Sequence, residues 1–363
     1  MIDSTVLKYE EKLNLALREL YGAYGYLPFR MSRFEEYDLY VSNKPFLVSD
    51  SVITFTDTDG KLLALKPDVT LSIVKNCRPA KGAVEKLYYN ENVFRVSRGT
   101  HDFREIMQTG LECIGALDTA ALAEVVRLAA ESLARIDSGY ILDLSHLGVV
   151  GAAIDALSLD DAARAELLVA LGGKNPHAMR AVLTAAGVSE QAAAPLFALL
   201  HAKGHPADVL PALLEAFSGN AAALAALGEL SAIAEAAGNS RIRIDFSVIH
   251  DMSYYSGIVF RGFVPGVASG VLSGGQYDKL AGKLCGAEGA CGFAVYLDLL
   301  EDRREVSEKD SEIFLLYGEG DAPDAVLRAA DALRRSGARV RTGRALPVGF
   351  RADCVKTLGE VDV

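Results

Sequence analysis

The sequence lacks the long apolar stretch that a membrane-spanning helix requires, since no run of about 18 or more uninterrupted apolar residues occurs in it. Residues 1–20 mix charged and apolar positions, and they do not show the basic region followed by an apolar region that is typical of a secretion signal. We therefore expect a cytoplasmic protein that has no membrane partner.

Cysteine is scarce, and the cysteines are widely spaced. The five cysteines form no C-x-x-C pair, and neither His101 nor His250 stands at a metal-ligand spacing from another histidine or from a cysteine. Neither a disulfide framework nor a metal site is therefore expected. Free buried thiols are the simplest interpretation of these residues.

Sequence motifs for binding nucleotide phosphates and for common hydrolytic chemistry are also missing. No glycine cluster is followed by Lys-Ser or Lys-Thr as in a P-loop, and no nucleophile elbow or metalloprotease helix motif occurs. The formal net charge of -11 does not suit a chain that mainly neutralises phosphates, so nucleic acid is not an expected partner. The residues predict no catalytic group and no cofactor.

The apolar pattern predicts an α+β core that is interrupted by a helical block. In residues 5–24 and 118–137, apolar positions recur at helical spacing. Residues 28–115 instead consist of short runs of β-forming residues separated by turn signals. Residues 146–238 are rich in Ala and Leu and have almost no strand character. Strict alternation returns at residues 241–246, which predicts that the sheet resumes there.

Three parts follow from this pattern. We expect a core built from residues 1–143 and 240–305, and a helical insertion at residues 144–239. After a charged linker, residues 310–363 are expected to form a short α/β C-terminal segment, in which residues 312–340 have a strand, helix, strand pattern.

Polar residues gather on one face of an expected strand at residues 106–112. The period of two places Gln108, Gly110 and Glu112 on the same face, and the glycine leaves room for a ligand between the two polar side chains. The same period places Asp68 and Thr70 on one side of the preceding 65–70 stretch, although its proline makes regular pairing uncertain.

This set of side chains suits a cationic ligand group. Carboxylates with an amide and a hydroxyl can accept hydrogen bonds from an α-ammonium or an imidazole N–H. Spacing alone leaves a second interpretation open, namely a solvated sheet face that carries ordinary surface carboxylates.

A glycine-rich strand pair is expected at residues 253–277, followed by a helix near residues 292–303. Tyr254 and Tyr255 stand at the entry of this pair, and the Gly274-Gly275 pair lies in its second half. Paired glycines allow a ligand to approach the backbone closely, although simple tight turns are their more common use.

Taken together, these segments resemble histidyl-tRNA synthetase and, more closely, its paralogues, the regulatory subunits of ATP phosphoribosyltransferase. The resemblance covers residues 5–143 and 240–303, and Gln276 stands where the synthetase loop has an arginine. It implies a class II synthetase-like antiparallel sheet flanked by helices. The matching segments, in chain order, are 65–70, Phe94-Arg95, 103–112, Tyr254-Tyr255, 273–278 and 292–295.

The resemblance also implies a histidine pocket. Its carboxylates would hold the amino group and the imidazole of the ligand, and its two tyrosines would complete the wall. The implied pocket residues are Asp68, Thr70, Gln108, Glu112, Tyr254 and Tyr255.

Departures from the synthetase pattern fall on the positions that handle ATP. Asp102, His250 and Leu299 stand where the family has arginines in motif 2, in the histidine-specific peptide and in motif 3. A synthetase needs such preorganised cations to stabilise the charge on ATP phosphates. Arg95 and Arg104 remain as candidates for anion contacts.

The resemblance therefore implies a non-catalytic, histidine-binding regulatory subunit, which is required for the activity and feedback control of the first step of L-histidine biosynthesis. Its expected partner is a short-form catalytic subunit of ATP phosphoribosyltransferase, with a homodimer as the core of the complex. A divergent histidyl-tRNA synthetase and a synthetase-like amino-acid ligase are the alternatives. Both would need an intact ATP site, and the segment after Glu312 is short for an anticodon-binding domain.

Overall fold

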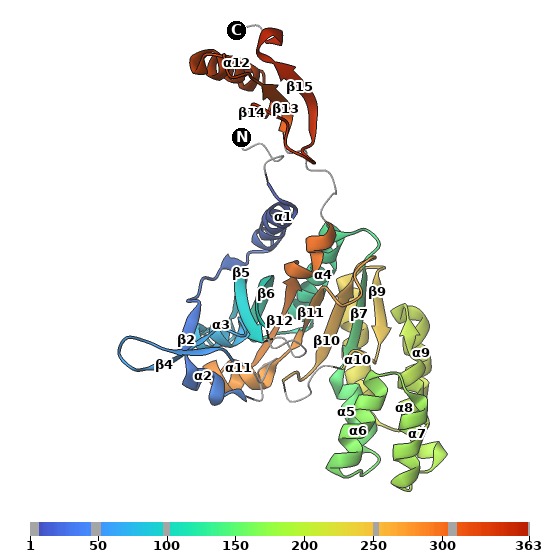
Figure 1. Ribbon diagram of the computed structural model, residues 1–363. Coiled ribbons are helices and arrows are strands. Elements are labelled where there is room, and N and C mark those ends of the chain that lie inside the picture. The colour runs from blue at the N-terminus through green and yellow to red at the C-terminus, as the bar shows by residue number, and fades with distance from the viewer. Residues whose placement is uncertain (1–6, 45–51, 97–101, 250–253, 304–310, 362–363) are drawn as a thin grey trace. The chain divides into compact units, whose positions relative to one another are not determined.

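The computed structural model describes residues 7–44, 52–96, 102–249, 254–303 and 311–361 (Figure 1). The chain divides into two compact units, Met1–Asp302 and Arg303–Val363. Among the described residues, no helix is both long and apolar enough to cross a membrane.

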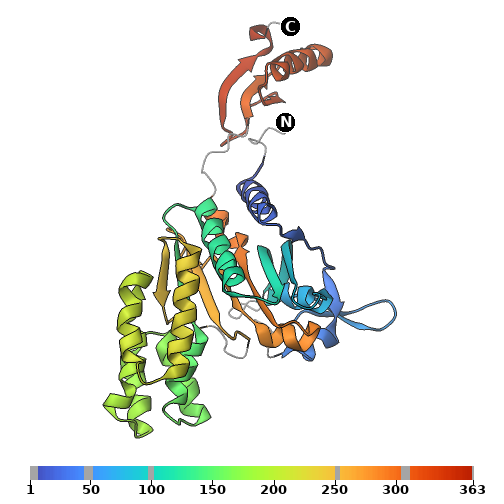
Figure 2. The ribbon, with the colours of Figure 1, turned by 180° about the vertical axis from the view of Figure 1, so that it is seen from behind.

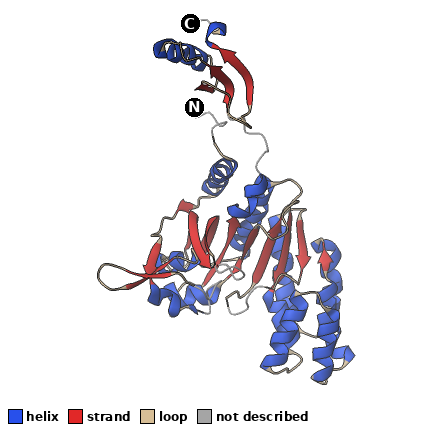
Figure 3. Ribbon diagram, in the orientation of Figure 1, coloured by secondary structure: helices blue, strands red, loops and turns tan. Residues whose placement is uncertain are grey.

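A nine-stranded sheet forms the centre of the first unit (Figure 3). Neighbouring strands are antiparallel except for the parallel pairs β1–β5 and β7–β9. The sheet is therefore mixed rather than wholly antiparallel. Its strands, in spatial order, are β1 (Leu27–Pro28), β5 (Val84–Val96), β6 (Phe103–Gly115), β12 (Gly289–Tyr296), β11 (Leu272–Gln276), β10 (Ile258–Phe263), β7 (Ile141–His146), β9 (Ile242–Asp245) and β8 (Lys203–Gly204).

Helices α1 (Tyr9–Ala23) and α4 (Thr119–Ile136) cover one face of this sheet (Figure 2). The apolar residues of α1 recur at helical spacing, so its Leu13, Leu17 and Leu20 side chains are buried together. Both helices were expected from the sequence, and both are present.

The opposite face of the sheet carries α3 (Thr70–Asn76) and α11 (Asp278–Cys285) at one end. Leu71, Ile73 and Val74 of α3 form a second apolar cluster with Leu280 of α11 and with sheet residues. These two helices leave part of the sheet face uncovered by helix, and the polar residues predicted from the sequence lie on this face.

The helical insertion lies between β7 and β9 and contains only one short strand, β8. Side chains at Asp160, Asn175, Ser189 and Asn220 cap four of its helices by accepting backbone N–H groups. Its apolar residues join the core cluster of the sheet. Its helices are α5 (Leu147–Asp155), α6 (Asp161–Gly172), α7 (Pro176–Ala185), α8 (Glu190–His201), α9 (Pro206–Ala216) and α10 (Ala221–Ala237).

The helix predicted at residues 292–303 is wrong. Residues Gly289–Tyr296 form strand β12, which pairs with β11 on one side and with β6 on the other, and only Leu297–Arg303 is helical, as a 3-10 helix. The reason is that a strand buried on both faces shows an unbroken apolar run, and such a run cannot be distinguished from a buried helix by periodicity.

The strand-like alternation assigned to residues 65–70 is also wrong. Strand β4 (Leu62–Leu65) ends before Pro67, which cannot donate a ladder hydrogen bond, and α3 begins at Thr70. β4 instead belongs to a small antiparallel sheet with β2 (Phe34–Glu36) and β3 (Thr54–Thr56).

The second unit is a small parallel α/β fold. Its three strands have the order β14-β13-β15, and α12 (Pro323–Arg335) packs on the sheet through Ala329, Ala330 and Leu333. The strand, helix and strand expected between residues 312 and 340 are present. The strands are β13 (Ser311–Leu316), β14 (Val340–Gly343) and β15 (Ala352–Thr357).

Candidate functional site

The centre of the candidate site is Glu112 on strand β6. Its side chain is only 1% exposed, and its strand neighbour across the ladder is Gly292 of β12. A Cβ atom added at Gly292 would lie 1.8 Å from Glu112 Oε2, so the carboxylate lies directly over the glycine backbone. The glycine is therefore needed for space at this position.

Two hydroxyl groups donate to the Glu112 carboxylate. Thr70 Oγ1 donates to Oε1 at 2.6 Å, and the Tyr277 hydroxyl donates to Oε2. Burial raises the pKa of Glu112 to about 8, and the nearby Asp68 acts in the same direction, while the two hydroxyl donors oppose the rise. A cationic ligand group at this position would favour the ionised carboxylate.

Asp68 lies in the turn that leads into α3. Its side chain is 8% exposed, and its Oδ1 accepts a hydrogen bond from the Leu71 backbone N–H at 2.9 Å. Burial raises the pKa of Asp68, whereas this backbone hydrogen bond and the Arg95 guanidinium lower it. Arg95 is held nearby because its Nε donates to the Pro67 carbonyl at 3.1 Å. The predicted pairing of Asp68 with Thr70 thus arises from a helix entry rather than from a strand.

Three tyrosine rings form one wall of the site. The ring centroids of Tyr254 and Tyr255 are 4.5 Å apart, and those of Tyr254 and Tyr277 are 5.8 Å apart. Burial raises the pKa of the Tyr254 hydroxyl, which is also close enough to Asp68 and Glu112 to be raised by their charge and to hydrogen-bond with Thr70. The structure therefore brings the tyrosine pair to the two acids.

Gln108 lies on the same face of β6 as Glu112 and is 3% exposed. Within the described part of the chain, its amide Nε2 has no hydrogen-bond partner. An unsatisfied buried donor is costly, so this amide is available to an acceptor group of a ligand.

The residues predicted to contact an anion lie farther along the antiparallel pair β5–β6, toward the end of β5 and the start of β6. Arg95 and Arg104 are direct cross-strand partners in β5 and β6, with Arg95 half-buried and Arg104 exposed. Asp102 is exposed just before β6 begins, and Leu299 is 37% exposed in the 3-10 helix after β12. His250 lies outside the described residues.

Sequence reasoning missed three contributors to the site. Tyr277 was seen only as part of the 273–278 segment, and nothing in its spacing shows that its hydroxyl meets Glu112. The fully buried Lys66 forms an ion pair with Glu91, which is the cross-strand partner of Gln108. Tyr89 lies over Gly110, where an added Cβ would be 2.7 Å from its hydroxyl oxygen, and alternation along β5 could have placed it there.

The fold and these buried polar side chains define a class II synthetase-like protein with an acidic candidate site. The described residues contain no group of three or more His, Cys, Asp or Glu side chains that could hold a metal ion. The bonding partners in the pocket are hydroxyls, carboxylates and an amide, which suit an organic ligand with N–H groups and a carboxylate.

Comparison with known proteins identifies the family. The family described as histidyl-tRNA synthetase matches residues 4–300. A regulatory subunit of ATP phosphoribosyltransferase from Moorella thermoacetica is 30% identical, over 91% of this chain and 86% of the relative. One from Symbiobacterium thermophilum is 33% identical, over 69% of this chain and 64% of the relative. The chain therefore belongs to the histidyl-tRNA synthetase family and, within it, to the ATP phosphoribosyltransferase regulatory subunits, as the resemblance implied.

Solved structures agree on the fold. A Bacillus halodurans structure titled ATP phosphoribosyltransferase regulatory subunit/histidyl-tRNA synthetase aligns with a TM-score of 0.78, at 23% identity, over 96% of this chain and 93% of that chain. A chain of the ATP phosphoribosyl transferase (HisG:HisZ) complex from Thermotoga maritima aligns with a TM-score of 0.61, at 16% identity, over 78% of this chain and 96% of that chain. The predicted class II-like α+β fold is confirmed.

Proposed function

We propose that this chain is the non-catalytic, histidine-sensing regulatory subunit of a cytoplasmic ATP phosphoribosyltransferase. It acts on a separate catalytic subunit in the first step of L-histidine biosynthesis. The names of the relatives support the regulatory role. The observation that carries the histidine-sensing part is the buried Glu112 carboxylate, fixed by one hydroxyl on each oxygen.

L-Histidine matches the groups that this pocket offers. The imidazole N–H donates to Glu112, whose orientation is set in advance by Thr70 and Tyr277, so little ordering cost remains on binding. The α-ammonium group is attracted to the buried Asp68. The α-carboxylate accepts from the unsatisfied Gln108 amide, and the tyrosine wall packs against the ring.

The same site does not support adenylate formation. That reaction places negative phosphate charge beside the amino acid and needs preorganised cations around it. Asp102 and Leu299 supply no positive charge, and the buried Lys66 is paired with Glu91. The two arginines that remain in the motif segments, Arg95 and Arg104, stand directly opposite each other at the outer end of the hairpin. Loss of one preorganised donor typically costs ~10²–10³-fold in rate, so we expect no synthetase or ligase activity.

Regulation requires a partner whose affinity or activity differs between the histidine-bound and histidine-free states. The Thermotoga maritima neighbour is a chain of a HisG:HisZ complex, and we propose that this chain likewise assembles with a short-form catalytic subunit. We propose a homodimer as the core of the assembly. In support, Phe34 and Phe55 are exposed side by side on the small sheet, with ring centroids 5.8 Å apart.

Two measurements on the purified chain test the proposal. Titration calorimetry with L-histidine is expected to show saturable binding, with D-histidine and L-glutamine as ligand controls. Histidine-dependent exchange of pyrophosphate into ATP is expected to stay at background. Failure to bind L-histidine would refute the sensing function, and exchange at a synthetase-like rate would establish the alternative enzyme.

A further inference from the structure

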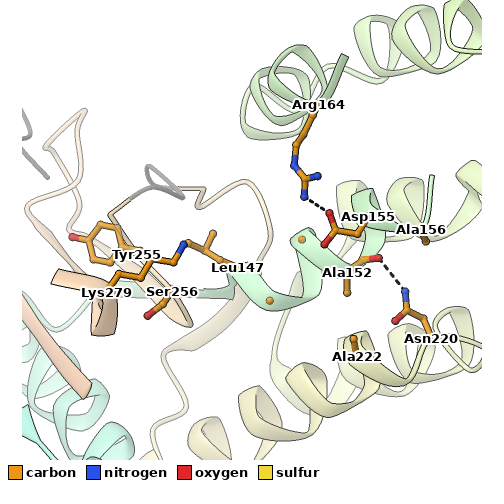
Figure 4. Close-up of a pocket in the computed structure, with 12 residues that line it drawn as sticks. Leu147, Ala152, Asp155, Ala156, Arg164, Asn220, Ala222, Tyr255, Ser256 and Lys279 are labelled. Carbon is orange, nitrogen blue, oxygen red and sulfur yellow. Dashed lines mark hydrogen bonds and ion pairs between the residues drawn. The ribbon is translucent and has the colours of Figure 1, made fainter. Parts of the chain in front are cut away.

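The segment that carries Tyr255 lies between the histidine pocket and a separate cavity of about 510 Å³. Tyr255, Ser256 and Lys279 line one side of this cavity, and helices α5, α6 and α10 of the helical insertion line the other (Figure 4). This cavity opens to solvent, so part of the tyrosine segment borders space that no other side chain fills. Tyr255 packs against the apolar cluster of Leu147, Val248 and Val259, and unfilled space lies beside this contact.

A hydrogen-bonded network also holds this segment. We call it the Asp278 network, and it consists of Ser256, Gln276 and Asp278. Asp278 Oδ2 accepts from Ser256 Oγ at 3.0 Å and from Gln276 Nε2 at 2.8 Å, while Asp278 N–H donates to Ser256 Oγ at 3.2 Å. The Ser256 N–H donates to the Gln276 carbonyl at 2.8 Å. The network thus joins the tyrosine segment to the end of β11 and to the first turn of α11.

Asp278 is itself fixed to the sheet. Its Oδ1 accepts from the Ala290 backbone N–H at 3.0 Å, and Ala290 belongs to β12. The carboxylate therefore accepts from three donors, which come from three separate segments of the chain. Because the sheet holds the Asp278 carboxylate, the hydrogen bonds from Asp278 to Ser256 fix Ser256 relative to the sheet. Ser256 is the residue next to Tyr255.

Two glycines allow the tyrosine segment to lie directly on β11. A Cβ added at Gly275 would lie 2.8 Å from Cδ1 of Tyr255, and one added at Gly257 would lie 2.1 Å from Oε1 of Gln276. The Tyr255 ring therefore rests on the bare backbone of β11 on one side, with the cavity on the other side of its segment.

We propose that Asp278 and Gln276 are positioning residues that keep Tyr255 in the wall of the histidine pocket and out of the neighbouring cavity. This inference rests on the proposed histidine-binding function. When the network is broken, the cavity offers Tyr255 a second place to settle, and the histidine pocket loses one ring of its wall. Asp278 and Gln276 act through Tyr255 and do not touch the ligand.

The variants Asp278→Ala and Gln276→Leu test this proposal with two readouts. We expect L-histidine to bind about 10-fold more weakly or worse, since each change removes hydrogen bonds to a charged group. We also expect a changed near-UV circular dichroism spectrum without ligand. That spectrum reports tyrosine packing here, because the chain has no tryptophan. Asp278→Asn keeps one acceptor oxygen and should restore part of both signals.

Asp118→Ala is the matched control. Asp118 caps α4 by accepting the Ala121 N–H at 2.8 Å, and it belongs to the opposite face of the sheet. The control should lower the melting temperature but leave histidine affinity and the tyrosine spectrum unchanged. A double-mutant cycle adds a direct test, because Asp278→Ala should cost no further affinity in a Tyr255→Ala background if Asp278 acts through that ring.

The proposal is wrong if folded Asp278→Ala keeps both the wild-type spectrum and the wild-type affinity, or if the two substitutions are additive. If Asp278→Ala does not fold, Gln276→Leu decides by the same two readouts. If the wild-type chain binds no histidine, the proposed function fails. The ligand-free spectra then still decide whether the Asp278 network positions Tyr255.

Discussion

The two ends of the β5–β6 hairpin carry polar residues of opposite character on the same face of the sheet. At the inner end, Glu112 is buried, and each of its oxygens accepts a hydroxyl hydrogen bond. At the outer end, Arg95 and Arg104 stand opposite each other, and Arg104 is exposed. Like charges directly across a strand pair are unfavourable unless solvent or an anion screens them. The polar group at the inner end is thus held by internal hydrogen bonds, whereas the charges at the outer end face each other.

Among substitutions at the two ends of the hairpin, Glu112→Gln should weaken histidine binding the most. Replacing the carboxylate with an amide removes a charged acceptor from the imidazole site, and we expect histidine binding to weaken by about 1.5–3 kcal/mol. Titration calorimetry on the folded variant measures this loss. Unchanged affinity would place the histidine site elsewhere in the chain.

Tyr277→Phe should have a smaller effect, because it removes a group that orients Glu112 and leaves the carboxylate in place. We expect affinity to fall by about 0.5–1.5 kcal/mol, the usual net contribution of one hydrogen bond. Tyr24→Phe is the matched control, since its hydroxyl donates to Glu131 at 3.0 Å far from the pocket. Equal losses of histidine affinity in the two variants would show that Tyr277 has no specific role in binding.

The buried Glu112 at the inner end of the hairpin should also make the stability of the fold depend on pH. The pKa of Glu112 rises from 4.5 to about 8 on folding, so the folded state holds this proton more tightly than the unfolded state does. Its contribution to stability is complete below the unfolded pKa and is lost as the pH rises through about 8.

The melting temperature of the wild-type chain should therefore fall relative to that of Glu112→Gln between pH 6 and 8.5, in thermal scans at matched ionic strength. Histidine should reverse this fall, because its positive charge stabilises the ionised carboxylate. A constant difference between the two melting curves across this range would contradict the assignment of the raised pKa to Glu112.

Arg104→Ala should have the smallest effect on histidine binding. The side chain is exposed at the outer end of the hairpin, and surface substitutions of this kind usually stay within about 0.5 kcal/mol. Calorimetry should therefore give nearly the wild-type histidine affinity. A loss comparable to that of Glu112→Gln would show that the two ends of the hairpin form one site.

The strand that carries Gln108 and Glu112 was predictable because local alternation decides it, and the structure places both residues on one buried face. Helices α1 and α4 were predictable for the same reason, at a different period. The histidine-binding role of the six pocket residues came from the resemblance rather than from spacing, and it stays a prediction.

Other features depend on contacts that no local pattern contains. Tyr277 meets Glu112 across 165 residues of sequence, and the buried Lys66 pairs with Glu91 on another strand. Strand β12 is buried on both faces, so its apolar run was mistaken for a helix. Asp68 reaches the site from a helix entry that follows Pro67, and the strand period could not describe it.

The central claim is that this chain passes a histidine signal to a separate catalytic subunit. The direct test is to mix the purified chain with a short-form ATP phosphoribosyltransferase catalytic subunit and to measure phosphoribosyl transfer from phosphoribosyl pyrophosphate to ATP, with and without L-histidine. We expect transfer to require the chain and histidine to inhibit the mixture, with Glu112→Gln needing about 10–150-fold more histidine, in line with its lost hydrogen bond. Equal activity and equal inhibition with and without the chain would contradict the regulatory account.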